Sequence, residues 1–555
     1  MDLREELANL IFPNITGNIS DLEEKYKERN LIEGAKVTRF APSPTGFLHT
    51  GSLFTALVAS KIAHDSKGVF YTRLEDTDTK REIAGSGEQL IKQLHEFEID
   101  PDEGYLGNTE KGNYGPYIQS KRKEIYEIVI KDMLKKGLAY PCFLTEEELN
   151  TLRDEQTKDK IITGVYGKYA KYRDLDVSEA INFIKAGKPY VIRFKSNGNH
   201  ENKIKTHDEI RGDLELTEND QDIVIFKSDG LPTYHFAHLC DDHFMHTNLV
   251  TRGEEWLPSL PIHLELFKTM GWKAPKYAHL PVIMKMDNGT RRKLSKRKDP
   301  EASVDYFLSN GYEPHALLVY LMTIANSNYE DYIVQTKDYN IDNFKFSLKK
   351  MSLDGALFDN EKLNFYSKEI LGKMSKEEIA KKAYDWAKKY DVNFVKFIEK
   401  DYKHFEDILN IEREKKNPRK DYAKYSDIYP LIKFFDNEEF DKICVLSNLE
   451  FNSGISKEII FSFLNNYKDN FNLEFDENGW FNNVKDIGSK YGFCGDNKVY
   501  KQDPSKFNGN INDACEIIRI SLSGRKVTPN LYSIMKLLGV DECKRRFEKI
   551  LLLLK

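Results

Sequence analysis

Residues 36–97 alternate between strand and helix patterns in a way that few folds accommodate. A strand pattern, KVTRFA at 36–41, runs into a loop rich in proline and glycine, and an apolar helix pattern follows at 52–63. A second strand, VFYTRL at 69–74, leads to another helix pattern at 82–97. Strand, helix and strand at this spacing form a βαβ unit. The sequence therefore predicts a parallel, doubly wound α/β sheet.

The chain has 555 residues, which is too long for one core, because single cores rarely exceed roughly 250–300 residues. An irregular stretch rich in glycine and lysine reaches Tyr172, β-rich sequence follows, the α/β pattern resumes at 223–226, and nearly everything beyond 300 has helical periodicity. We therefore expect six parts: an N-terminal extension (1–35), a first α/β half (36–116), an insertion (117–222), a second α/β half (223–286), a lysine-loop domain (287–370) and a helical C-terminal region (371–555).

Composition excludes several classes of protein. The longest apolar stretches, 316–325 and 550–554, fall short of the ~20 residues that span a membrane, and the N-terminus has no signal-peptide core. The six cysteines are scattered without a CxxC pair, which favours reduced thiols in a cytoplasmic protein. The net charge of −6 does not indicate a nucleic-acid partner, but the basic patches at 291–298 and 413–424 offer local sites for phosphate. A solvated charged surface is the alternative interpretation of these patches.

The most informative string is RFAPSPTGFLHTGS at 39–52, a strand end followed by a loop and a helix start. Ligands of open parallel sheets lie at the carboxyl ends of the strands, and a helix N-terminus there offers free N–H groups to phosphate. Gly51 has no Cβ and permits close approach, and His49 adds a donor. The alternative is a proline-stiffened loop with a helix cap at Ser52.

A second string, KLSKR at 293–297, places two lysines in a short loop. Lysines on a mobile loop can close on the negative charge that pyrophosphate gathers as it leaves an α-phosphate. Taken alone, the string also fits a basic surface turn.

These strings carry a family resemblance. His49-Thr50-Gly51-Ser52 resembles the first signature of the class I aminoacyl-tRNA synthetases, the "HIGH" box, and KLSKR resembles the second, "KMSKS". The flanking RFAPSPTG and the string LEDTD at 74–78 are similar to the glutamate and glutamine branch, and the segments at 351–359 and 521–532 resemble, more loosely, the helical parts of bacterial glutamyl-tRNA synthetases.

The resemblance implies a Rossmann-type sheet, an insertion that holds the acceptor end of a tRNA, and an all-helical anticodon-binding region. It implies that L-glutamate is activated with ATP and joined to the 3′-terminal adenosine of tRNA-Glu. The expected partners are tRNA-Glu, L-glutamate and ATP, without a membrane, and the chain is expected to be a monomer. Whether tRNA-Gln is also charged stays open.

A glutamate site needs cations for two carboxylates and an anion for the ammonium group, and the arginine fork suits carboxylates. The resemblance assigns the site residues as follows. Glutamate is bound by Arg39, Ala41, Ser43, Glu75, Tyr234, His238 and Arg252; ATP is bound by His49, Gly51, Ser52, Glu255, Leu294, Ser295 and Lys296; the catalytic groups are His49, Gly51, Ser52, Lys293 and Lys296. The alternative for each arginine is an ion pair with a structural carboxylate such as Asp76 or Asp241.

We expect no zinc, although some relatives carry a cysteine-rich site in the insertion. The matching stretch keeps Cys142 but has Leu144 and non-ligand residues elsewhere, and zinc takes about four ligands. Mg²⁺ is expected to arrive with ATP.

Three other functions fit parts of the sequence. A glutamyl transferase that modifies a tRNA base resembles the first 300 residues but lacks a long C-terminal region. A small-molecule nucleotidylyltransferase shares an HxGH box but needs neither the RFAPSPTG context nor an anticodon domain. A non-catalytic tRNA-binding paralogue is expected to lose catalytic groups, whereas His49, Lys293 and Lys296 are all present.

Overall fold

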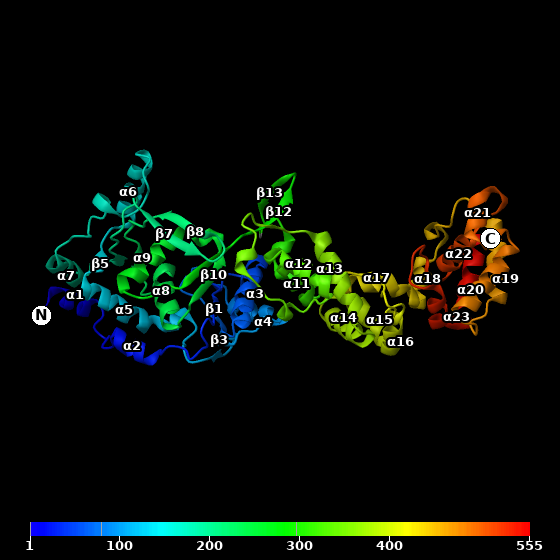
Figure 1. Ribbon diagram of the computed structural model, residues 1–555, viewed down its shortest axis with the longest axis horizontal. Coiled ribbons are helices and arrows are strands. Elements are labelled where there is room, and N and C mark those ends of the chain that lie inside the picture. Colours follow the sequence, from blue (N-terminus) through cyan, green and yellow to red (C-terminus); the bar gives the residue numbers. More distant parts are fainter. Residues whose placement is uncertain (1, 79, 296) are drawn as a thin grey trace. The chain divides into compact units, whose positions relative to one another are not determined.

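The computed structural model describes residues 2–78, 80–295 and 297–555, which form two compact units (Figure 1). The first unit comprises Met1–Phe307 and Leu318–Asp359, and the second comprises Leu308–Leu317 and Asn360–Lys555. Each unit has a hydrophobic cluster of its own.

The first unit contains the predicted parallel α/β arrangement. Strands β1 (Val37–Phe40), β2 (Val69–Thr72) and β3 (Glu103–Tyr105) are parallel, and the short β4 (Glu110–Lys111) closes the edge antiparallel to β3. Helix α3 (Thr50–Asp65) joins β1 to β2, and α4 (Ser86–Glu96) joins β2 to β3. Helix α3 is buried on several sides, as its apolar sequence requires.

A second group of parallel strands continues this layer. Strands β10 (Leu249–Gly253) and β11 (Lys276–Leu280) are parallel, and α8 (Tyr234–Phe244) and α9 (Leu260–Met270) accompany them. The backbone N–H of Asn248 donates to the Val37 carbonyl at 3.2 Å, and its side-chain oxygen accepts from the Val37 N–H at 2.9 Å. The two groups of strands therefore meet at β1 and β10. The hairpin of β7 (Lys203–Asp208) and β8 (Gly212–Thr217) extends the second group beyond β11.

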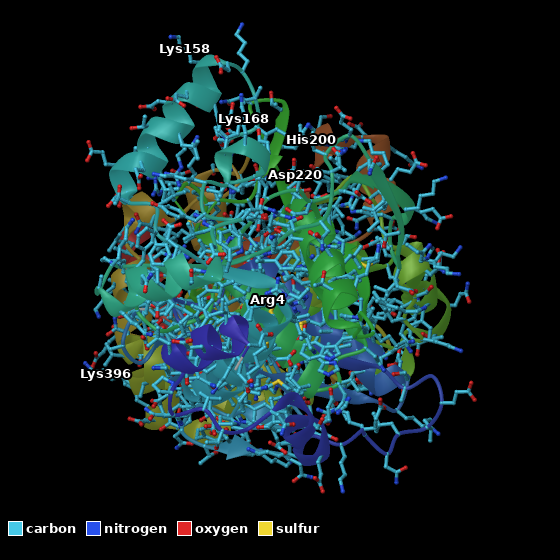
Figure 2. The ribbon with its side chains drawn as sticks, turned by 90° about the vertical axis from the view of Figure 1, so that its left-hand side faces the viewer. Arg4, Lys158, Lys168, His200, Asp220 and Lys396 are labelled. Atoms are coloured by element: carbon cyan, nitrogen blue, oxygen red, sulfur yellow. The ribbon has the colours of Figure 1, made fainter. Side chains whose placement is uncertain are left out.

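The insertion departs from the sequence expectation in two places. The stretch expected to be irregular contains α6 (Glu146–Lys158), whose N-terminus is fixed by a capping box between Thr145 and Glu148. Helix α6 extends away from the rest of the unit, with Lys158 at its free end (Figures 1 and 2). Strand β9 (Val224–Phe226), where the α/β pattern was expected to resume, pairs antiparallel with β6 (Val191–Phe194), which itself pairs with β5 (Ala139–Cys142). The remaining helices here are α5 (Lys123–Lys136) and α7 (Val177–Lys185).

The N-terminal extension folds into α1 (Leu3–Ile11) and α2 (Ile19–Lys25), and it packs on α5. Ala8, Phe12, Leu22 and Tyr26 belong to the same buried cluster as the apolar side chains of α5, α8 and α9. The ammonium group of Lys131 on α5 donates to the carbonyls of Phe12 and Ile15 at 3.0 and 2.6 Å. The extension is therefore an integral part of the first unit.

The lysine loop follows a hairpin of β12 (Ile283–Asp287) and β13 (Thr290–Lys293), and β14 (Ala356–Leu357) adds a parallel strand to β12. Between them lie α10 (Val304–Asn310), α11 (Pro314–Ala325) and α12 (Asn328–Thr336).

The second unit is helical, as predicted, except for a pair of two-residue strands, β15 (Phe493–Cys494) and β16 (Gly509–Asn510). Its helices are α13 (Asn360–Lys373), α14 (Lys376–Tyr390), α15 (Val392–Lys400), α16 (Tyr402–Asn410), α17 (Ile428–Ile432), α18 (Asn437–Ile443), α19 (Lys457–Asn470), α20 (Glu477–Ser489), α21 (Asn497–Gln502), α22 (Ile511–Ser523) and α23 (Leu531–Leu554). The buried cluster between Phe440 and Leu551 forms a separate core within this unit.

Candidate active site

A cavity of about 1280 Å³ opens in the first unit, where β1, β2, β10 and β11 reach their carboxyl ends. This is the position at which open parallel sheets bind ligands. Pockets for a single small molecule are usually about 300–1,000 Å³, so this cavity has room for a nucleotide together with a second small molecule.

Most of the residues assigned from the sequence line this one cavity. Those that do are Arg39, Ala41, Ser43, His49, Gly51, Ser52, Glu75, Tyr234, Arg252, Glu255, Lys293 and Leu294. His238 does not: it is fully buried behind Tyr234, with the two ring centroids 6.0 Å apart. Ser295 lies just beyond the lining residues, and Lys296 lies outside the described residues.

The segment that follows the lysine loop contacts the start of α3. The Nδ1 atom of His49 accepts from the Gly51 N–H at 2.9 Å, which places the proton of the neutral ring on Nε2. A Cβ added to Gly51 would lie only 3.1 Å from that Nδ1, so the group that approaches this glycine closely is the His49 ring itself. The Thr50 hydroxyl donates to the Glu301 carbonyl at 2.6 Å, and His49 forms a β-bridge with Ser303. The segment after the lysine loop is thus fastened to the first turn of α3.

A clamp between Arg292 and Asp299 holds the base of the lysine loop. The Arg292 guanidinium donates to both Asp299 oxygens at 2.6 and 2.8 Å, and the Ser295 N–H donates to the same carboxylate at 2.8 Å. The Arg292 hydrogen bonds hold the pKa of Asp299 well below its usual value. Lys293 lies 3.6 Å from a Glu255 oxygen, across the mouth of the cavity.

A buried charge network supports the other end of the cavity. Arg73 is fully buried and contacts Glu75 at 3.0 Å and Asp242 at 2.7 Å, and Arg39 lies 3.4 Å from Asp242. Burial acts to raise the pKa of Asp242, but the charges of Arg39 and Arg73 overcome it and hold that pKa far below normal. Burial raises the pKa of Glu75 against the opposing charge of Arg73.

Asp76 and Asp241, the alternative ion-pair partners that the sequence offers for Arg39 and Arg252, bind other groups. Asp241 binds Arg122 at 2.6 Å and the Tyr126 hydroxyl at 3.0 Å, and it lies 3.6 Å from Arg73. Asp76 accepts from the N–H and hydroxyl groups of Ser120. Arg39 has a structural partner in Asp242, which the sequence reasoning had not named.

Arg252 is held by neutral groups. Its Nε donates to His279 Nε2 at 3.0 Å, and its terminal nitrogens donate to His263 Nδ1 at 3.1 Å and to the Trp256 carbonyl at 3.3 Å. The ring of Trp256 packs against Tyr234 with centroids 4.4 Å apart, and the Tyr234 hydroxyl lies 3.5 Å from the guanidinium.

Sequence reasoning missed Arg73, Asp242, His263 and His279. Arg73 is the only charged residue in the strand string VFYTRL at 69–74, and a charge within such a string indicates a buried partner. The histidines gave no such signal, because their contacts depend on how α9 and β11 pack beside β10.

Within the described ranges, no three His, Cys, Asp or Glu side chains are grouped so that they could hold a metal ion. Among the described helices, none has both the length and the apolar character that crossing a bilayer takes.

Known proteins resemble this chain over nearly its whole length. A family model described as tRNA synthetases class I (E and Q), catalytic domain, matches residues 36–365, and an anticodon binding domain model matches 499–551. A glutamate–tRNA ligase of Clostridium perfringens is 46% identical over 550 residues, which cover 99% of this chain and 100% of that protein. One of Acetivibrio thermocellus is 43% identical over 548 residues, with 99% and 100% covered.

A solved structure is similar over nearly the same length. The crystal structure of a glutamate tRNA ligase from Elizabethkingia meningosepticum in complex with its amino acid has a TM-score of 0.74 at 27% identity, and the match covers 94% of this chain and 100% of that one. The relatives extend through the C-terminal region, for which the transferase alternative gives no counterpart. The chain therefore belongs to the class I tRNA synthetases for glutamate and glutamine, and among them to the glutamate–tRNA ligases.

Proposed function

We propose that this chain activates L-glutamate with ATP inside the cavity and transfers it to the 3′-terminal adenosine of tRNA-Glu. One observation carries the proposal: a single cavity joins the helix start at His49 and Gly51 to the arginine-lined end at Arg39 and Arg252. The first end suits phosphates and the second suits carboxylates.

The phosphate end is built from α3 and the lysine loop. The positive dipole end of α3 faces the cavity at Gly51 and Ser52, and the Nε2–H of His49 is a donor of matching chemistry. Lys293 and Lys296 stabilise the negative charge on the departing pyrophosphate. Leu294 and Ser295, which lie between them, contact ATP. Glu255 orients the side chain of Lys293.

The carboxylate end binds glutamate. Arg252 and Arg39 take carboxylate groups, the Tyr234 hydroxyl adds a donor, and Glu75 takes the ammonium group. Ala41 and Ser43 line the wall of this end. We assign His238 the indirect role of supporting Tyr234, because it is buried behind that ring.

The first step needs no base. The α-carboxylate oxygen of glutamate attacks the α-phosphorus of ATP, the new O–P bond forms as the bond to the β-phosphate breaks, and pyrophosphate leaves; Mg²⁺ would be held by the phosphate oxygens of ATP. In the second step a ribose hydroxyl of the tRNA attacks the acyl carbon and gives its proton to a phosphate oxygen of the adenylate, and AMP leaves with the electron pair of the broken C–O bond. The site contributes alignment and charge stabilisation to both steps.

The remaining regions are assigned to the tRNA. The insertion at 117–222 binds the acceptor end, 287–370 contacts the stem, and 371–555 binds the anticodon, with the family match at 499–551 in its last part. We infer a cytoplasmic monomer.

The proposal is tested by charging tRNA-Glu and tRNA-Gln with labelled glutamate and ATP. Replacing Lys296 by alanine should lower the charging rate by about 10²–10³-fold with little change in the KM for glutamate, because it removes a donor used only in the transition state. Lys92→Ala, at an exposed lysine of α4 outside the cavity and outside the regions assigned to the tRNA, is the matched control. Wild-type turnover in Lys296→Ala would refute the role of the loop, and a parent protein unable to charge either tRNA would refute the function.

A further inference from the structure

Arg252 differs from the other buried arginines beside the cavity. Arg39 and Arg73 both face the carboxylate of Asp242. Arg252 is equally buried, yet among the residues that the structure describes no carboxylate oxygen lies within ion-pair distance of its guanidinium. A buried charge without a counter-ion is costly. Such an arrangement indicates that the anion comes with a ligand.

The partners of Arg252 fix the protonation of three histidine rings. Arginine has only donors, so His279 Nε2 and His263 Nδ1 must both be unprotonated acceptors. The proton of His279 is then on Nδ1, where it is donated to Asp208 Oδ2 at 2.7 Å. The proton of His263 is on Nε2 and is donated to His235 Nδ1 at 3.0 Å. The arginine is thus oriented by two imidazoles whose own orientation is fixed behind it.

Asp208, the carboxylate behind His279, does not contact Arg252 itself. The His279 ring stands between them, and the Asp208 carboxylate also accepts from the backbone N–H groups of Ile210 and Arg211 at 3.0 Å each. Burial lowers the pKa of His263 well below its usual value, so the ring next to the guanidinium stays neutral near pH 7. The positive charge of Arg252 is therefore not cancelled by the groups that hold it.

We propose that His263 and His279 are positioning residues that orient Arg252 through neutral acceptors, leaving its charge for the side-chain carboxylate of the amino acid, and so make the site prefer glutamate to glutamine. The inference rests on the proposed function. A carboxylate in either position would also orient the arginine. Such a carboxylate would, however, neutralise the charge of Arg252. Glutamine, which is nearly equal in size to glutamate, would then compete with glutamate for the site.

An isosteric pair of variants separates charge from packing. His263→Asn keeps a neutral oxygen near the position of Nδ1, and His263→Asp puts a carboxylate of the same size there. For each we would measure the KM for glutamate and the inhibition constant of glutamine during tRNA charging. In His263→Asn, the KM for glutamate and the inhibition constant of glutamine should both stay within about fivefold of those of the parent. Asp should raise the KM for glutamate by about 10²-fold, and the preference for glutamate over glutamine should fall about as much, because a charge at this distance is worth several kcal/mol. The KM for ATP should change little in both.

The outcomes are distinguishable. If the parent protein charges tRNA with glutamate and His263→Asn and His263→Asp have the same kinetics, His263 has only a packing role; the inference is then overturned and the proposed function is not. If the parent protein does not use glutamate, both the proposed function and the inference are overturned. At the second ring, His279→Gln keeps a neutral acceptor for Arg252 and should also leave the KM for glutamate within about fivefold of the parent. If His263→Asp fails to fold while His263→Asn folds, the inference is also overturned, because a carboxylate beside an unpaired guanidinium should be tolerated.

Discussion

At the scale of single residues, the phosphate end of the site depends on the short distance between the His49 ring and the backbone of Gly51. A Cβ at residue 51 would lie 3.1 Å from the Nδ1 atom of the His49 ring, closer than most Cβ contacts, so the ring would have to shift. This explains in steric terms why the signature has glycine there, independently of any contact with ATP.

Replacing Gly51 by alanine should therefore displace the His49 ring. A misplacement of about 1 Å in a catalytic group can cost ~10²-fold, so kcat/KM for ATP should fall by at least about tenfold, whereas the melting temperature should not fall, since alanine is about 1 kcal/mol better than glycine in a helix. Steady-state kinetics and thermal unfolding would measure both. Gly488→Ala is the matched control, because a Cβ there meets neighbours only at ordinary contact distance, 3.5 Å or more. Unchanged ATP kinetics in Gly51→Ala would contradict the steric argument.

At the scale of elements, the β12–β13 hairpin presents the lysine loop through the Arg292–Asp299 clamp. Asp299→Asn removes the charge that binds both Arg292 nitrogens and the Ser295 N–H. We expect kcat to fall about tenfold or more, because the loop loses its fixed base, with the KM for glutamate unchanged within about twofold.

The control uses the other acid bound to Arg292. Asp287 is exposed at the hairpin turn, and exposed ion pairs are usually worth about 0–1 kcal/mol, so Asp287→Asn should leave the kinetics near those of the parent. If kcat falls equally in Asp299→Asn and Asp287→Asn, the effect comes from the hairpin as a whole and not from the clamp.

Helix α8 also makes the first unit sensitive to acid. Burial lowers the pKa of His235 and of His238 to about 4. Between about pH 6.5 and 4 the unfolded chain binds protons that the folded chain does not, so the free energy of unfolding should fall with pH, by up to about 3 kcal/mol per group at pH 4. Urea unfolding at several pH values would measure this. His235→Asn should flatten the slope and the exposed His207→Asn should not; a slope unchanged by His235→Asn would contradict the assignment.

The elements that the sequence predicted well are those with a strong local pattern. Strand β1, helix α3 and strand β2 are mostly buried, and the β-branched and aromatic residues of the strands and the apolar run of the helix made their type readable directly. Helix α6 was missed because the only buried residue among its thirteen is Gln156, so it has no hydrophobic period; the available signal was the capping string beginning at Thr145. The residues that line the site were readable from the signature strings, but the groups behind them were not, because His263 and His279 reach Arg252 from 11 and 27 residues away.

At the scale of the whole molecule, the separate cores allow part of the tRNA-binding region to be removed. A cut at 371 would divide α13, whereas the buried cluster that starts at Phe440 lies entirely beyond residue 435. Deleting residues 436–555 should leave a folded protein with an intact cavity.

In this truncated protein we expect kcat/KM for tRNA to fall by about 10²-fold, since contacts to unpaired anticodon bases are worth about 1–3 kcal/mol each. Charging kinetics against tRNA concentration would measure it, with ATP and glutamate binding as the internal control. An undiminished kcat/KM for tRNA would show that this region has another role.

The packing of the N-terminal extension has a consequence for synthesis on the ribosome. Tyr26 binds the Gly115 carbonyl, and Glu23 binds His243, whose codon lies 220 positions downstream. At about 5–20 residues per second, some 10–40 s pass between the emergence of Glu23 and that of His243. Helix α5 can cover part of the apolar faces of α1 and α2 earlier, but the side chains of α8 and α9 that complete the cluster emerge late in that interval or after it. We expect the incomplete first unit of the nascent chain to bind chaperones until α9 has left the exit tunnel.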